Sequence, residues 1–74
     1  MTLLDGKAGE SYKVKELMTD EDVMRRLEVL GINEDTNVKI LNRKRNGSMI
    51  IKVRGSRLAI GRNIAACIEV REGE

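Results

Sequence analysis

The sequence predicts a mostly β domain, a small five-stranded barrel with one helix between the first two strands and a short helical turn before the last strand. Three observations predict it. Two turn signals, Asn46-Gly47 and Gly55-Ser56, separate segments of alternating apolar residues. An acidic segment with helical apolar spacing precedes them. The length of 74 residues suits one small domain, expected over residues 1–74.

The first two elements are expected to be a strand over residues 11–17 and a helix over residues 20–30. Alternation along the strand places Tyr12 and Val14 on its inner face. The helix has one apolar stripe at helical spacing, formed by Val23, Leu27 and Leu30.

Both ends of this helix have recognisable signals. Thr19 precedes three acidic residues, which resembles a capping box and suits the positive end of the helix dipole. Gly31 follows the last apolar residue and takes the left-handed conformation easily. Ile32 is then expected to fold back on Leu27.

The basic second half is expected to form a three-stranded meander over residues 36–45, 48–54 and 57–61. Two-residue turns place Ile40 opposite Val53, which in turn lies opposite Leu58. The same turns place Ile51 opposite Ile60. Both turns therefore put these residues on one apolar face, as a consistent register requires.

The chain is expected to end with a helical turn over residues 63–66 and a strand over residues 67–71. Ile68 and Val70 would face the core. Cys67 is either a reactive thiol or a small apolar residue at the strand start, and the second interpretation is favoured because free cysteines are usually buried and inert.

Composition excludes several function classes. The chain has no histidine and one cysteine, so one copy cannot build the usual zinc, haem or iron–sulfur site, and we expect no metal and no cofactor. Because histidine is absent, the Ser–His and Cys–His catalytic pairs are also excluded. The nucleotide-binding motifs G-x-x-x-x-G-K-[ST] and G-x-G-x-x-G do not occur either, so we expect that the protein is not an enzyme. With no signal peptide and no segment of membrane-spanning length, we expect a cytoplasmic protein without membrane insertion.

Charges are segregated along the chain. Residues 16–35 hold seven acidic and two basic residues, whereas residues 39–62 hold eight basic residues and no acidic one. The predicted register places Lys39, Arg54 and Arg57 in one outward cross-strand row, although like charges in such a row destabilise a sheet. Further cations lie at the adjoining hairpin tip: Arg43, Lys44 and Arg45.

The basic surface predicts an anionic partner, either an acidic protein surface or a phosphate backbone. The alternative is that the acidic helix of the same chain, or the solvent, neutralises it. Nucleic acid is not favoured because Tyr12 is the only aromatic residue and faces inward, although duplex binding through phosphates alone stays open. Met24 lies at the margin of the helix stripe, either in the core or on a partner surface.

Three strings in order resemble the FeoA family: R-R-L-E-V-L-G-I at residues 25–32, Thr36-x-Val38, and V-R-G-S-R-L-A-I at residues 53–60. The opening Leu4-Asp5 with Gly9, and the ending Ala66-x-Ile68-x-Val70, fit as well. Two positions depart from the family pattern. Glu34-Asp35 stands where Pro-Gly is usual, and Ser56 stands where an aromatic residue is common.

The resemblance implies an SH3-like barrel and a small cytoplasmic accessory protein of ferrous iron uptake that works with a FeoB-type permease. Since the chain has no histidine, its part in iron uptake would be indirect. The hypothesis is an adaptor that binds the permease's cytoplasmic part and modulates it. Alternatives are a regulatory module like that at the C-terminus of iron-dependent repressors, a binder of nucleic-acid backbones, or a weakly self-associating module.

Overall fold

The computed structural model describes residues 1–73, which form one five-stranded antiparallel sheet and three short helical elements. The helical elements are the 3-10 turn η1 (Leu3–Asp5), α1 (Glu21–Val29) and α2 (Arg62–Cys67). The strands are β1 (Ser11–Leu17), β2 (Asn37–Arg43), β3 (Met49–Val53), β4 (Ser56–Ile60) and β5 (Ile68–Glu72). The mostly β class and the order of elements are confirmed, and η1 is an addition that the sequence did not predict.

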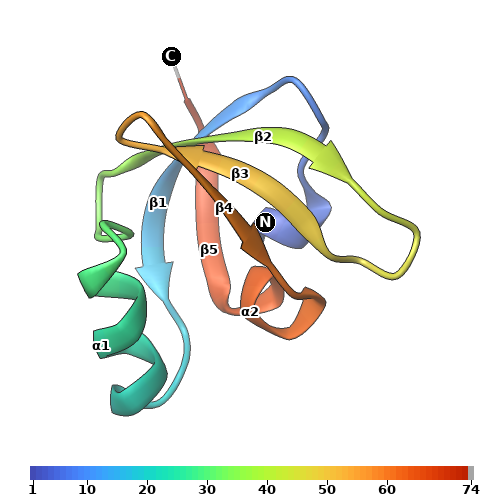
Figure 1. The fold of residues 1–74 in the computed structure, drawn as a ribbon. Coiled ribbons are helices and arrows are strands. Elements are labelled where there is room, and N and C mark those ends of the chain that lie inside the picture. Colours follow the sequence, from blue (N-terminus) through green and yellow to red (C-terminus); the bar gives the residue numbers. More distant parts are fainter. Residues whose placement is uncertain (74) are drawn as a thin grey trace.

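The sheet is curved and has the strand order β4-β3-β2-β1-β5. Strand β1 pairs with β2 on one side and β5 on the other, with a bulge between Val14 and Glu16. A second bulge lies between Ile40 and Asn42 of β2, and bulges of this kind bend a strand. Figure 1 shows the sheet curling around the core, with α2 joining the edge strands β4 and β5. The result is a small, partly open barrel.

Helix α1 starts one residue later than expected. Asp20 is its N-cap, because the Asp20 side chain accepts a hydrogen bond of 2.9 Å from the backbone N–H of Val23. Thr19 was predicted to cap the helix and lies one position outside. An aspartate carboxylate at the N-cap also interacts favourably with the helix dipole.

The end of α1 is the Schellman turn that the sequence predicts. Gly31 has a φ of +92° and donates a hydrogen bond of 3.0 Å to the Glu28 carbonyl. Ile32 donates one of 2.9 Å to the Leu27 carbonyl and is fully buried. Leu30, which was predicted to face the core, is 49% exposed. The turn directs Ile32 into that space instead.

The β2–β3 hairpin differs from the two-residue turn expected at Asn46-Gly47. Gly47 donates a hydrogen bond of 3.0 Å to the Lys44 carbonyl, and Lys44 donates one of 2.9 Å to Ser48. Gly47 has a positive φ, whereas Asn46 does not. This is the longer hairpin loop with a type I turn followed by a left-handed glycine. It places Ile40 opposite Ile51, rather than opposite Val53.

The β3–β4 hairpin turns one residue earlier than expected. Arg54 and Gly55 are its central residues, with φ values of 50° and 84°, as a type I′ turn requires. Val53 therefore pairs with Ser56, and Ile51 pairs with Leu58. The predicted partners were Leu58 and Ile60, respectively, so that register was wrong by two residues.

A shift of two residues keeps every side chain on its predicted face, because side chains alternate along a strand. The inward residues of the meander are buried as predicted, with Leu58 half-buried. Tyr12 and Val14 are also buried, at 5% and 0% exposure. The core is completed by residues from η1, α1, α2 and β5: Leu3, Leu27, Ala65, Ile68 and Val70. Cys67 ends α2 instead of starting the last strand.

Candidate partner-binding surface

A row of three cations crosses the outer face of the meander. Lys39 of β2 lies opposite Lys52 of β3, and Lys52 lies opposite Arg57 of β4. All three side chains are exposed. Sequence reasoning placed Arg54 in this row and missed Lys52. A turn centred on Arg54-Gly55 pairs Arg57 with Lys52, so the correct turn position would have identified Lys52 as the third member.

Lys39, Lys52 and Arg57 together form the basic row. Within residues 1–73, no acidic residue forms an ion pair with it. The side-chain ion pairs within residues 1–73 join Arg25 to Asp22 at 4.0 Å and Arg71 to Asp35 at 3.8 Å. The acidic helix α1 therefore does not neutralise the row by direct contact. The row is left as a repulsive arrangement that an anionic partner would relieve.

Arg54 lies at the β3–β4 turn, beside the end of α1. Its Nε donates a hydrogen bond of 3.3 Å to the Gly31 carbonyl. A cation at a helix C-terminus interacts favourably with the exposed carbonyl groups there. Arg54 therefore connects the meander to α1, and its guanidinium is displaced from the basic row.

Arg43 and its neighbours at the β2–β3 hairpin have different surroundings. Arg43 donates hydrogen bonds to the carbonyls of Gly6 and Leu4, the latter at 2.7 Å, and so attaches the N-terminal segment to β2. Lys44 and Arg45 are exposed at the hairpin tip. Of the predicted hairpin cations, these two are the ones that the structure leaves directed to solvent.

Met24 is half-buried and packs against the core, at the margin of the helix stripe as expected. The more exposed apolar side chains of this region are Val29, at 81%, and Leu30. Together with Arg25 and Arg26 they line a shallow groove on the outer side of α1. The sequence did not predict this groove, because it assigned Leu30 to the core.

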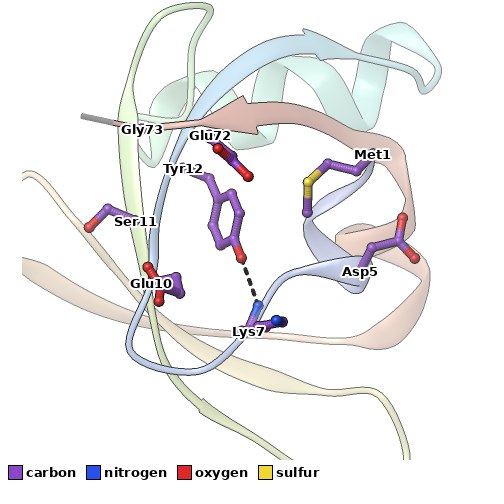
Figure 2. Close-up of a pocket in the computed structure, with 8 residues that line it drawn as sticks. All are labelled: Met1, Asp5, Lys7, Glu10, Ser11, Tyr12, Glu72 and Gly73. Carbon is purple, nitrogen blue, oxygen red and sulfur yellow. Dashed lines mark hydrogen bonds between the residues drawn. The ribbon is translucent and has the colours of Figure 1, made fainter.

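A polar pocket lies at the opposite end of β1 from α1, between η1 and the end of β5. It is lined by Met1, Asp5, Lys7, Glu10, Ser11, Tyr12, Glu72 and Gly73. Figure 2 shows the Tyr12 hydroxyl pointing into it, where it accepts a hydrogen bond of 2.8 Å from the backbone N–H of Lys7. Acidic and basic side chains are mixed here, so the pocket favours no single charge of ligand.

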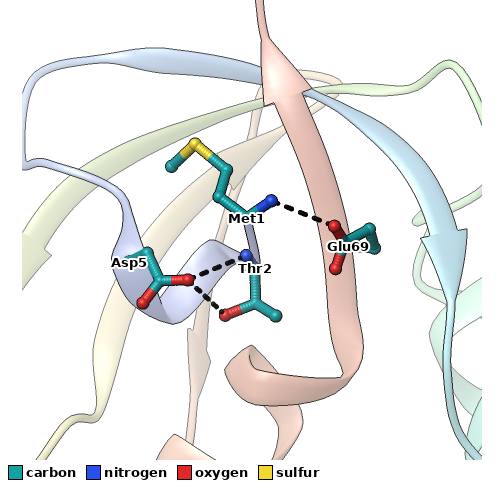
Figure 3. A network of polar contacts seen from close by, with 4 residues as sticks. All are labelled: Met1, Thr2, Asp5 and Glu69. Carbon is teal, nitrogen blue, oxygen red and sulfur yellow. Dashed lines mark hydrogen bonds and ion pairs between the residues drawn. The ribbon is translucent and has the colours of Figure 1, made fainter.

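The N-terminal segment is held by a small polar network, shown in Figure 3. The Met1 amine lies 3.0 Å from Glu69 Oε1. The Thr2 backbone N–H donates to Asp5 Oδ2 at 3.0 Å, and this hydrogen bond lowers the pKa of the Asp5 carboxyl. The network positions η1, whose Leu3 side chain is fully buried.

Within residues 1–73, no group of three or more potential ligands is arranged to hold a metal ion. Cys67 is half-buried, with its Sγ donating to the Asn63 carbonyl at 3.1 Å. None of the described helices has the length and apolar character needed to cross a bilayer.

Comparisons with known proteins agree with this fold. The sequence matches the FeoA domain family over residues 1–72. It is 40% identical over 68 residues to "Putative Fe(2+) transport protein A" of Methanocaldococcus jannaschii, which covers 92% of this chain and 82% of that protein. The solution structure of the FeoA protein from Chlorobium tepidum has a TM-score of 0.89 and 30% identity, covering 97% of this chain and 70% of that one.

The fold also occurs in a protein of another class. A manganese-dependent transcriptional repressor has a TM-score of 0.88 at 20% identity, covering 97% of this chain and 41% of that chain. At this identity the likeness concerns the fold alone. The SH3-like barrel implied by the sequence resemblance is confirmed.

Proposed function

Because the chain belongs to the FeoA family, we propose that it is a cytoplasmic, non-catalytic accessory protein of ferrous iron uptake. In this proposal it binds the cytoplasmic part of a FeoB-type permease through the basic row and biases the permease's conformation or nucleotide cycle. The single observation that supports the contact surface is the basic row, which crosses three strands without an acidic partner in residues 1–73. Complementary charges across an interface raise association rates and select partners.

Iron is not expected to bind this chain in the proposed role. The metal would be the permease's cargo, and this protein would act on the carrier. The composition supports an indirect role, since the sequence has no histidine. The name of the Methanocaldococcus jannaschii relative also refers to Fe(2+) transport.

The test is a binding titration with the isolated cytoplasmic part of a cognate FeoB-type permease at physiological salt. A double charge reversal, Lys52→Glu with Arg57→Glu, is expected to weaken binding about tenfold or more, because interfacial charge pairs become repulsive. The matched control is Arg25→Glu with Arg26→Glu, which changes the net charge equally but on α1. Equal affinities for wild type and the meander variant would contradict the proposed surface.

The control also separates two contact surfaces. If the α1 variant weakens binding and the meander variant does not, the groove beside Val29 and Leu30 is the contact instead. Duplex DNA in the same assay tests the nucleic-acid alternative. The only aromatic side chain, Tyr12, is 5% exposed and offers no stacking surface, so we expect no measurable duplex affinity at physiological salt.

A further inference from the structure

The two edge strands of the sheet, β5 and β4, differ in whether another segment covers their outer backbone groups. At the outer edge of β5, the Val70 backbone N–H donates a hydrogen bond of 2.9 Å to the Met1 carbonyl, and Thr2 forms a bridge with Glu69. Figure 3 shows this N-terminal segment lying beside the strand. At the other edge, β4 pairs with β3 alone. Within residues 1–73, no other segment forms backbone hydrogen bonds with β4, and Figure 1 shows no strand beyond it.

The register identifies the backbone groups that this edge leaves free. The two-residue turn closes with Val53 opposite Ser56, which makes these two residues a hydrogen-bonded pair. Pairs alternate along an antiparallel ladder, so Leu58 and Ile60 also point their backbone groups toward β3. Arg57 and Ala59 therefore direct their N–H and C=O groups away from the sheet. Both residues are exposed, and no other segment within residues 1–73 forms a backbone hydrogen bond with them.

The side chains beside these free groups have a definite chemistry. Arg57 is the last member of the basic row and stands directly at the edge. Ala59, two positions along, lies opposite the half-buried Ile50. A strand added to β4 would place every second side chain on this outer face. Two such side chains, two residues apart on the added strand, would lie beside Arg57 and Ala59, respectively.

We propose that the free edge of β4 binds an extended acidic segment of a partner protein as a sixth antiparallel strand, with an acidic side chain beside Arg57 and an apolar one beside Ala59. This is β-strand addition, in which backbone hydrogen bonds supply affinity and alternate side chains supply specificity. It deepens the proposed function, because it specifies how the basic row would meet the permease. The acidic side chain relieves the repulsion between Lys52 and Arg57.

Two other occupants fit this edge less well. A second copy of this chain paired through β4 would bring two basic rows onto one face, and like charges across strands are destabilising. Exposed cations at an edge disfavour pairing between identical copies for this reason. A nucleic-acid backbone would satisfy the cations but does not match the alternating donors and acceptors of Arg57 and Ala59.

The direct test uses a defined probe, an acetylated and amidated octapeptide titrated into the ¹⁵N-labelled full chain. Its odd positions alternate between glutamate and valine and its even positions are serine, so that glutamate and valine share one face of the added strand. We expect shifts confined to β4 and its neighbours. At about 90% occupancy, exchange of the Arg57 and Ala59 amide protons should slow about tenfold, since each becomes hydrogen-bonded. No shift in β4 at millimolar peptide would overturn the proposal. Equal binding of the lysine–valine peptide, which is the same octapeptide with lysine in place of each glutamate, would also overturn it.

A backbone variant separates strand addition from simple charge attraction. Ala59→Pro removes the outward N–H and leaves the β3–β4 hydrogen bonds intact, since proline is tolerated at such edge positions. It should weaken octapeptide binding about tenfold, whereas the matched Ala59→Val should bind like wild type. Should Ala59→Pro fail to fold, Arg57→Glu provides the second test, with an expected preference for the lysine–valine peptide. Unchanged binding by a folded Ala59→Pro variant would contradict strand addition.

The same variants distinguish this inference from the proposed function. If the permease's cytoplasmic part binds wild type and Ala59→Pro equally, the edge proposal fails and the accessory function stands. If that part binds neither, while the octapeptide behaves as expected, the edge stands and the permease assignment fails. A wild-type dimer that Ala59→Pro abolishes in sedimentation would make a second copy the occupant and overturn the proposal. The proposal would also be overturned if duplex DNA bound with the affinity of the octapeptide and Ala59→Pro left that affinity unchanged.

Discussion

Lys52 has a cation on each side, and neither pairs with a described acidic residue. Lys39 and Arg57 lie directly opposite it on the two neighbouring strands. Lys52→Glu converts both repulsive pairs into attractive ones, each contributing a few tenths of a kcal/mol at this exposed position. We expect a rise in melting temperature of about 2–6 °C for a domain of this size, measured by circular dichroism.

Lys15→Glu is the matched control for this substitution. Lys15 is exposed in the bulge of β1 and has no cross-strand partner, so its reversal should leave the melting temperature nearly unchanged. A domain that becomes more stable while losing its partner is typical of a binding surface maintained against stability. A lower melting temperature for Lys52→Glu would show that the row is not repulsive.

Asp5 provides a pH-dependent test of the N-terminal network. The Thr2 hydrogen bond lowers the Asp5 pKa below its usual value of 3.8. A group with a lowered pKa stabilises the folded state above its unfolded pKa, and that contribution is lost as the pH falls through the folded pKa. Asp5→Ala should therefore unfold at a lower temperature than wild type at pH 6. The difference should shrink as the pH falls below the usual value of 3.8, and a constant difference from pH 6 to pH 2 would contradict the assigned role.

At the scale of elements, the sequence predicted which side of the sheet each strand residue faces better than it predicted the residue's cross-strand partner. Ile40, Ile51 and Val53 are buried as expected although their pairing shifted by two residues, because burial depends only on the parity of the register. The turn centres were uncertain because a glycine signals a positive φ without specifying its position in the loop. Gly47 follows a type I turn, and Gly55 comes second in a type I′ turn.

The candidate site depended on those partners, so it was predicted only in part. Lys39 and Arg57 were assigned correctly to the row, and Lys52 replaced Arg54 when the turn moved by one residue. The attachment of the N-terminal segment gave no local signal, since Arg43 reaches the Leu4 carbonyl across the fold. Long-range contacts of this kind follow from the assembled barrel and not from periodicity.

Gly31 ends α1 and contacts the β3–β4 turn, where its carbonyl accepts a hydrogen bond from Arg54 Nε. Its φ is +92°, and a Cβ built there would lie 3.1 Å from Arg54 Cδ. Gly31→Ala is expected to reduce the free energy of unfolding by about 1–2 kcal/mol, measured by urea titration. Gly61→Ala is the control, because Gly61 has a φ of −81° and a Cβ built there would meet nothing within 4 Å. Equal stability of both variants would exclude strain at the helix end.

For the whole molecule, the net charge of +2 conceals a basic meander and an acidic helix on one small barrel. Partner binding through the basic row should therefore depend on salt mainly in the association rate, because long-range steering is screened within about 10 Å at 0.1 M salt. Between about 50 and 500 mM salt we expect the association rate constant to fall at least tenfold.

The dissociation rate measured in the same experiment tests the strand-addition geometry. Backbone hydrogen bonds at β4 lie between paired strands and are screened little, so the dissociation rate constant should change less than about threefold over this salt range. Lys52→Glu should flatten the salt dependence of association, whereas Ala59→Pro should leave it intact and speed dissociation. The two variants should therefore differ in the rate constant that they change, because the charges of the basic row set the association rate and the backbone hydrogen bonds at β4 set the dissociation rate. A salt effect confined to dissociation would contradict steering by the basic row.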